Sequence, residues 1–140
     1  MLVRLLYASR ITSVSQEAID AILSSSRQHN PESGVTGILC YGGGIFLQAI
    51  EGGRMAVSNL YGQIQRDIRH KDVMLLQYEE ISERRFSGWT MGQVDMARVN
   101  TSILLKYAEK PELDPYSVSG NVSMALLEEL MATASILGRA

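Results

Sequence analysis

Hydrophobic and polar positions follow two different periods in the first part of the chain. Leu2 to Ala8 is short and apolar, and its period of two predicts a strand with Tyr7 on the inward face. Apolar residues then recur at helical spacing, which predicts a first helix. We expect this helix to end by Asn30, because Pro31 disfavours helical geometry in the residue before it.

The next segments predict an open sheet with a second helix. Strands are expected over 35–41, 45–51, 73–81 and 89–94. The run Gly42-Gly43-Gly44 is typical of a hairpin between the first two of these. A helix is expected after Gly53, with one apolar side formed by Val57, Leu60, Ile64 and Ile68. The order predicts an α+β fold, a ferredoxin-like βαββαββ sandwich with both helices on one face of a mixed sheet.

The pattern changes near residue 97, so we expect a domain over 1–97 and a C-terminal helical extension over 98–140. Residues 102–109 are weakly helical, and two prolines then bracket a polar connector. Residues 124–137 show a clear amphipathic helical stripe. Such a helix either covers the bare face of the sheet or offers a surface to a partner.

Composition and charge exclude several classes of protein. At 140 residues with 46% hydrophobic positions, the chain can bury one ordinary core. The net charge is −2 with scattered basic residues, which argues against a nucleic-acid partner. No apolar run approaches the ~18 residues of a membrane span, and no signal segment is evident, so we expect a cytoplasmic protein. Cys40 is the sole cysteine and lies in an apolar strand, where burial is expected.

A set of polar and aromatic residues lies at element ends or on strand faces that the pattern assigns to the core. Its members are Tyr7, His29, Asn30, Gln48, Trp89 and Met91. The set holds no strong base or nucleophile, so it does not suit hydrolysis. A phenol and an indole can donate an electron, and an amide can exchange its hydrogen bonds. These properties suit a bound redox chromophore.

Each of these residues also has a simpler interpretation. Tyr7 and Met91 fit ordinary core packing, and His29 with Asn30 fits a helix end. A buried Gln48 amide left unpaired costs roughly 1–3 kcal/mol, so it needs either a local backbone partner or a bond to Tyr7 or a ligand. A histidine metal site is not expected, because His70 is placed far away at the end of the second helix. Glu51 and Asp67 could form an acid–base pair, but no pattern brings them together.

Several separate motifs nevertheless occur together. They are Leu5-Leu6-Tyr7-Ala8-Ser9, Asn30-Pro31 with Gly34-Val35-Thr36-Gly37-Ile38-Leu39, Phe46-Leu47-Gln48 with Glu51-Gly52, and Phe86-Ser87-Gly88-Trp89-Thr90-Met91. With them the chain resembles the BLUF family, which senses blue light using FAD, from about Leu2 to Asp95. The fold of that family agrees with the element order above.

The resemblance implies a flavin between the two helices. It implies that the flavin is held by Ile22, His29, Asn30, Ile64, Asp67 and Arg69. Ser9, Trp89 and Met91 would surround Gln48. Photoexcitation would draw an electron and a proton from Tyr7 and rearrange the hydrogen bonds of Gln48, with no covalent adduct.

The short extension implies a non-enzymatic sensor that signals to a separate effector protein, and we expect self-association into a homo-oligomer that light can change. Two alternatives remain open from the sequence. One is a non-photoactive ferredoxin-like enzyme or small-molecule binding module. The other is an interaction scaffold with a degenerate flavin site.

Overall fold

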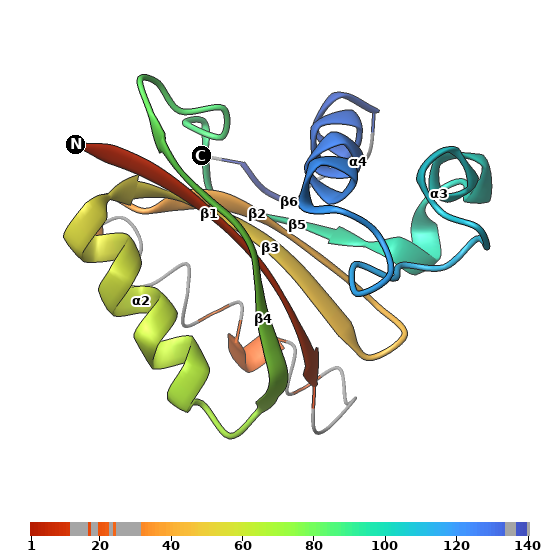
Figure 1. Cartoon of the computed structure of the whole chain (residues 1–140), viewed down its shortest axis with the longest axis horizontal. Helices are drawn as coiled ribbons and strands as arrows, with labels where there is room; N and C mark the ends of the chain where they lie inside the picture. Colours follow the sequence, from red (N-terminus) through yellow and green to blue (C-terminus); the bar gives the residue numbers. More distant parts are fainter. Residues whose placement is uncertain (12–16, 18–19, 23, 25–31, 134–136, 140) are drawn as a thin grey trace.

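The computed structural model describes residues 1–11, 17, 20–22, 24, 32–133 and 137–139, with backbone alone for residues 89, 90 and 137–139. A twisted sheet forms the centre, with α2 on one face and α3 and α4 on the other (Figure 1). The strands are β1 (Leu2–Ile11), β2 (Thr36–Gly42), β3 (Ile45–Gly53), β4 (His70–Ile81), β5 (Trp89–Asp95) and β6 (Leu137–Arg139). The helices are α2 (Arg54–Arg66), α3 (Thr101–Tyr107) and α4 (Gly120–Thr133), with a short 3-10 helix η1 (Met96–Arg98).

The strand order is β4-β1-β3-β2-β5-β6 within the described part of the chain. β1 pairs antiparallel with both β3 and β4, whereas β2 pairs parallel with β5. Gly43 and Gly44 both have positive φ, 58° and 77°, which suits the two-residue hairpin between β2 and β3. The register sets Tyr7 of β1 directly opposite Gln48 of β3. The two central strands therefore bring together the residues that the sequence singled out.

The face of the sheet under α2 carries one hydrophobic cluster. Its members from the sheet include Val3, Leu5, Tyr7, Phe46 and Ile50, and Val57 of α2 is fully buried against them. Residues 20–22 and 24 are helical, and Ile22 joins the same cluster. The prediction that both helical segments pack on one face is confirmed for these residues.

Two local expectations on this side were wrong. Ile68, expected in the apolar stripe of the second helix, is 88% exposed and lies beyond its end. The helix stops at Arg66 because Asp67 has an extended backbone and its carboxylate accepts a bond from the Arg69 N–H, a turn that starts the passage to β4. No helix was expected between Asn30 and Gly53, but Glu32 and Ser33 are helical before Gly34 turns the chain at φ 74°.

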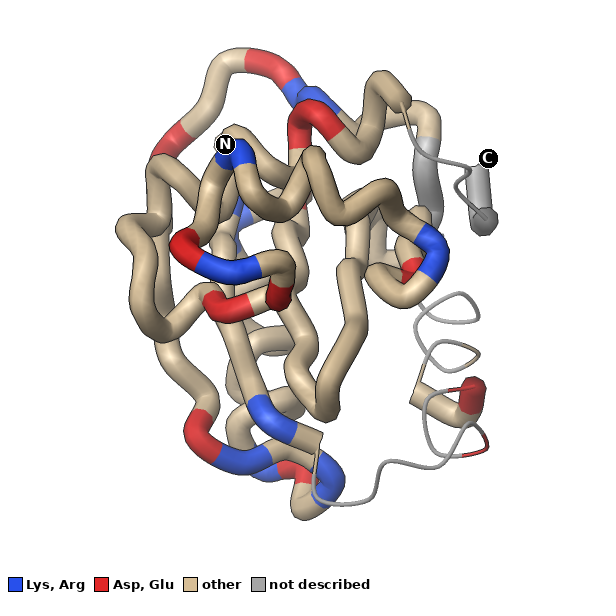
Figure 2. Tube along the Cα trace, turned by 90° about the vertical axis from the view of Figure 1, so that its right-hand side faces the viewer, with Lys and Arg blue, Asp and Glu red and all other residues tan. Residues whose placement is uncertain are grey.

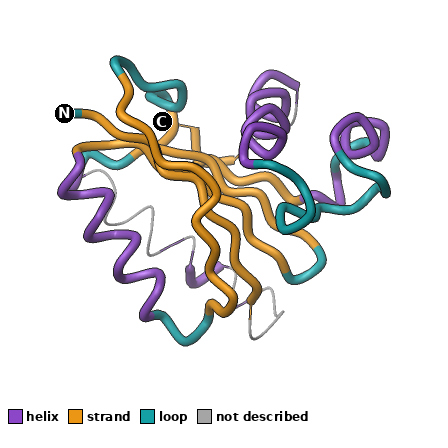
Figure 3. The backbone as a smooth tube through the Cα atoms, in the orientation of Figure 1, coloured by secondary structure: helices purple, strands orange, loops and turns teal. Residues whose placement is uncertain are grey.

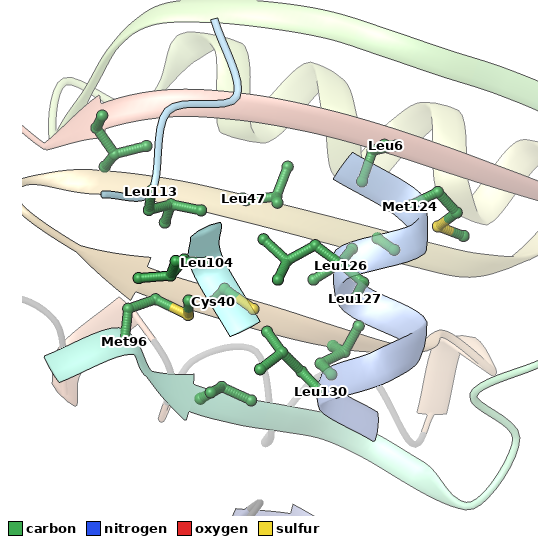
Figure 4. Close-up of a cluster of buried hydrophobic side chains, with 14 of the residues drawn as sticks. Leu6, Cys40, Leu47, Met96, Leu104, Leu113, Met124, Leu126, Leu127 and Leu130 are labelled. Atoms are coloured by element: carbon green, nitrogen blue, oxygen red, sulfur yellow. The ribbon is translucent and has the colours of Figure 1, made fainter. Parts of the chain in front are cut away.

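The opposite face is covered by α4 and α3, as Figure 4 shows for the side chains. Leu127 and Leu130 of α4 are fully buried in a cluster that also contains Leu6, Leu47 and Cys40. The extension thus covers the second face of the sheet, one of the two roles expected for it. Cys40 is buried as predicted, and burial raises the pKa of its thiol.

The limits of the last helix differ from the prediction. α4 spans Gly120–Thr133, so it begins before residue 124, and Leu137 lies in β6. Leu137 pairs with Gln93, which covers the outer edge of β5 with backbone partners. The periodicity of the side chains did not predict β6, because it carries no information about the backbone groups at the edge of β5.

The α+β, ferredoxin-like class is confirmed, with helices on both faces of the sheet (Figure 3). Acidic and basic residues are spread along the trace rather than gathered on one segment (Figure 2). Among the described residues, no helix is long and apolar enough to cross a membrane.

Candidate functional site

Tyr7, Gln48 and Met91 form a row of contacts across three strands. The Tyr7 hydroxyl donates a hydrogen bond to Oε1 of Gln48. The Gln48 amide nitrogen in turn donates to Sδ of Met91 at 3.2 Å. The row follows from the register, because Tyr7 and Gln48 are cross-strand partners and their side chains leave the sheet on the same face. The sequence alternative in which Gln48 bonds Tyr7 is the one that the structure shows.

Tyr7 lies in a dry, crowded environment. It is 1% exposed, and its ring centroid lies 5.6 Å from that of Tyr61 on α2. Burial raises the pKa of the Tyr7 phenol, and the neighbouring Tyr61 and Asp67 raise it further. The phenol therefore keeps its proton at neutral pH, and it can lose that proton only together with an electron or to a strong base.

Within the described part of the chain, the Gln48 amide does not use its full donor capacity. Its NH2 group carries two N–H donors, and its acceptor among the described residues is the thioether of Met91, which accepts weakly. Gln48 is 5% exposed, so water does not readily supply a better partner. A carbonyl acceptor brought to this face would offer the amide a stronger hydrogen bond than the sulfur does.

Apolar residues from two helical segments lie on the same face as this row. Ile22 is buried, and Ile64 of α2 is half-buried against the same cluster as Tyr7. The structure therefore brings these two residues, both predicted to hold the flavin, to the face of the sheet that carries Tyr7 and Gln48.

Asp67 and Arg69 form an ion pair just beyond the end of α2. The guanidinium of Arg69 meets both carboxylate oxygens, with Nη2 at 2.6 Å from Oδ2. These bonds lower the pKa of Asp67 and raise that of Arg69. The two residues predicted to bind the cofactor thus hold each other, close enough to Tyr7 for the charge of Asp67 to affect its pKa.

Ser9 and His70 form a second buried polar contact on β1 and β4. Ser9 Oγ and His70 Nδ1 are 2.8 Å apart, and the His70 ring packs edge-on against Phe46 at 5.5 Å between centroids. The prediction that His70 ends the second helix was wrong, because it is the first residue of β4 and is 8% exposed. The cause is the early end of α2 at Arg66, which leaves His70 to pair with Ile11.

This environment predicts that His70 makes folding pH-dependent. Burial lowers the pKa of His70 below its usual 6.5, although Asp67 opposes the shift. The unfolded chain then binds more protons, so the contribution of His70 to stability is complete above pH 6.5 and is lost as the pH falls below it. We expect urea unfolding between pH 7.5 and 5.5 to show a smaller loss of stability in His70→Asn than in the wild type. One proton limits the difference to about 1.4 kcal/mol per pH unit, and equal slopes would contradict the prediction.

Sequence reasoning missed two features of this region. Tyr61 fits the helical stripe four residues after Val57, so its contact with Tyr7 was within reach of the pattern. The other feature is the contact of Arg4, which is 5% exposed on β1 and bonds the fully buried Glu51. Glu51 and Asp67 do not pair, since each has its own arginine.

Some predicted site residues are not covered by these observations. His29 and Asn30 lie outside the described residues, and so does the side chain of Trp89. Met91 and Ser9 are described, and both are fully buried. Met91 contacts Gln48 directly, whereas Ser9 contacts His70.

The ferredoxin-like sheet carries a buried phenol–amide pair beneath two helical segments, an arrangement that suits a bound redox-active chromophore. Residues 2–92 match the family model described as "BLUF: Sensors of blue-light using FAD", and the chain belongs to this family. Blue-light sensing is thus the function of this domain, and FAD is its cofactor. The resemblance inferred from the sequence motifs is confirmed.

Known proteins similar to this chain differ greatly in length. The photoactivated adenylate cyclase subunit beta of Euglena longa is 36% identical over 92 residues, which are 64% of this chain and 11% of that protein. The BlsA photo-activated state is 30% identical with a TM-score of 0.85, covering 96% of this chain and 98% of BlsA. The dark state structure of the BLUF protein BlrB is 36% identical with a TM-score of 0.77, covering 94% and 95%. The chain therefore spans a small part of the cyclase subunit and nearly all of BlsA and BlrB.

Proposed function

We propose that this protein senses blue light through the Tyr7–Gln48 pair and passes the signal to a separate effector. The observation that carries the proposal is the buried bond from the Tyr7 hydroxyl to Gln48, whose amide nitrogen has a weak sulfur acceptor. FAD fits this site, because a flavin carbonyl would give the Gln48 amide a stronger acceptor than the Met91 sulfur. Ile22, Ile64, Asp67 and Arg69 would hold the cofactor, together with His29 and Asn30 by family resemblance.

Bound FAD supplies an electron acceptor that becomes strongly oxidising when it absorbs blue light. With that acceptor bound, Tyr7 would give up one electron to it and pass its hydroxyl proton to Gln48 Oε1 along their hydrogen bond. After the electron and proton had returned to Tyr7, the Gln48 amide would be left rotated or tautomerised, with its donor group no longer facing Met91. Cys40 takes no part, because it is buried on the other face of the sheet with a raised pKa.

The output would leave through the C-terminal part. We propose a sensor domain over 1–97 and an extension over 98–140 whose helices α3 and α4 cover the sheet. The cyclase relative is, by its name, a photoactivated enzyme, and this chain spans 11% of that protein. We propose that the effector is a separate protein in the cytoplasm, engaged directly or through light-dependent self-association. A non-photoactive binding module or enzyme is not favoured, because it leaves the family match unexplained.

Absorption spectra of the purified FAD-bound protein test the proposal. In the wild type we expect blue light to shift the flavin spectrum slightly to the red, with full recovery in darkness. Gln48→Leu removes the amide and is expected to lose the shift while retaining FAD. Gln77→Leu is the matched control, since Gln77 bonds Asn121 on α4 and is expected to keep the shift. Bleaching alone in the wild type, or a shift that survives in Gln48→Leu, would contradict the proposed chemistry.

A further inference from the structure

Tyr7 is buried, but a single strand separates it from one edge of the sheet. The strand order begins with β4, and within the described part of the chain β4 pairs only with β1. The register sets Leu75 of β4 opposite Tyr7, so the two side chains leave the sheet on the same face. Leu75 is 50% exposed, whereas Tyr7 is 1% exposed. Leu75 therefore stands between the Tyr7 phenol and the solvent at this edge.

Tyr61 covers the same phenol from the side of α2. Its ring is inclined at 50° to the ring of Tyr7, with 5.6 Å between the centroids. Tyr61 lies between Val57 and Ile64 on the stripe of α2 that packs on the sheet, and it is half-buried there. Tyr7 and Tyr61 meet through their rings, so a phenylalanine at position 61 would preserve this cover.

The hydrogen bond between Tyr7 and Gln48 depends on a dry environment. The Tyr7 hydroxyl donates to Oε1 of Gln48, and the amide nitrogen of Gln48 donates to Sδ of Met91. A water molecule beside this row would offer both a donor and an acceptor. It would stabilise an amide that is halfway through a rotation, and it would carry the proton of a tautomer back. Either effect lowers the barrier for return to the dark arrangement, so exclusion of water lengthens the light state.

We infer that Tyr61 and Leu75 form the water barrier of the photoactive phenol and thereby set how long its light state lasts. Both residues act through Tyr7 as positioning residues, and neither takes part in the transfer of the electron or the proton. Leu75 is the more sensitive position, because it is small and half-exposed at the sheet edge. The inference rests on the proposed function, in which the Gln48 amide rearranges in light.

The rate at which the red shift decays in darkness tests this inference in the FAD-bound full chain. Leu75→Ala is expected to keep the red shift and to recover about tenfold faster than the wild type, which corresponds to about 1.4 kcal/mol of barrier. Imidazole, used above its own pKa, is the probe of access, because a small neutral base accelerates a proton transfer only where it can reach the proton. We expect it to accelerate recovery further in Leu75→Ala and to have little effect on the wild type.

Met74→Ala is the matched control for the loss of side-chain volume. Met74 is the adjacent residue of β4 and is 47% exposed, but its partner is Ala8, so its side chain leaves the sheet on the opposite face. This variant is expected to recover at the wild-type rate, with as little response to imidazole. Leu75→Phe enlarges the cover and is expected to recover more slowly than the wild type.

Variants of Tyr61 distinguish cover by the ring from any role of its hydroxyl. Tyr61→Phe is expected to recover as the wild type does, and Tyr61→Ala to recover faster and to respond to imidazole. A role of the hydroxyl would instead make Tyr61→Phe behave like Tyr61→Ala, and this result would overturn the assignment of the ring as a cover.

Three results at β4 would also overturn the inference. The first is wild-type recovery in Leu75→Ala without a response to imidazole. The second is equal acceleration in Met74→Ala, which would indicate a general loosening of β4. The third is a wild type that shows the red shift but responds to imidazole as strongly as Leu75→Ala, and this result would leave the proposed function intact. A wild type with bound FAD and no red shift overturns the proposed function as well.

Discussion

Replacing Tyr7 with phenylalanine is expected to abolish the light-induced red shift completely while leaving FAD bound. The substitution removes the hydroxyl that donates to Gln48 Oε1 and keeps a ring of nearly the same volume in the core. Without that hydroxyl the side chain is a much poorer electron donor and has no proton to pass to the amide. The measurement is the difference spectrum between illuminated and dark protein, together with the ratio of flavin to protein absorbance.

Tyr61→Phe is the control for this experiment. Tyr61 packs against Tyr7 at 5.6 Å between ring centroids, and it is a second phenol on the same face of the sheet. No hydrogen bond from it to Gln48 is recorded among the described residues, so its loss is expected to leave the red shift in place. If Tyr7→Phe keeps the shift while Tyr61→Phe loses it, the electron and proton come from Tyr61 and the assignment of Tyr7 is wrong.

The sheet could be predicted because its strands are short, apolar and separated by glycine. The hairpin is an example, since Gly43 and Gly44 supply the positive φ that its turn requires. The ends of the helices and strands were harder to predict from the sequence. The apolar stripe placed Ile68 in the second helix, but that helix ends at Arg66, just before the turn at Asp67. Side-chain periodicity did not predict this end, because it does not report the conformation of the backbone.

The candidate site was predicted as a set of residue types, and its contacts required the fold. A glutamine on an apolar strand face indicates an unusual partner, but only the register shows that the partner is Tyr7. Contacts between polar groups from distant segments could not be predicted from the local sequence pattern. Arg4 and Glu51 are 47 residues apart in sequence, and each alone would be taken for a solvent-exposed strand residue. His70 was misplaced for the same reason, since its contact with Ser9 depends on where β4 begins.

Glu51→Leu is expected to lower the free energy of unfolding by about 3–5 kcal/mol, the range found when one partner of a buried ion pair is removed. Arg4 would remain 5% exposed, with only the half-exposed Glu79 as its counter-charge. The backbone N–H groups of Arg85 and Phe86 would also lose their acceptor. Urea unfolding of wild type and variant at equal, saturating FAD measures the difference, because cofactor binding itself stabilises the folded state.

The double variant Arg4→Met with Glu51→Leu distinguishes the cost of an unpaired charge from the cost of unpaired backbone donors. Replacing both members of a buried pair by apolar side chains is often close to neutral, so most of the loss should be recovered. The bond from the N–H of Phe86 to Glu51 is still lost, which leaves a deficit of about 1–3 kcal/mol. A double variant as unstable as Glu51→Leu would mean that the grip of Glu51 on the loop between β4 and β5, and not the charge of Arg4, dominates the energy. In that case the main contribution of Glu51 to stability is to fix the loop through the N–H groups of Arg85 and Phe86, and its ion pair with Arg4 contributes less.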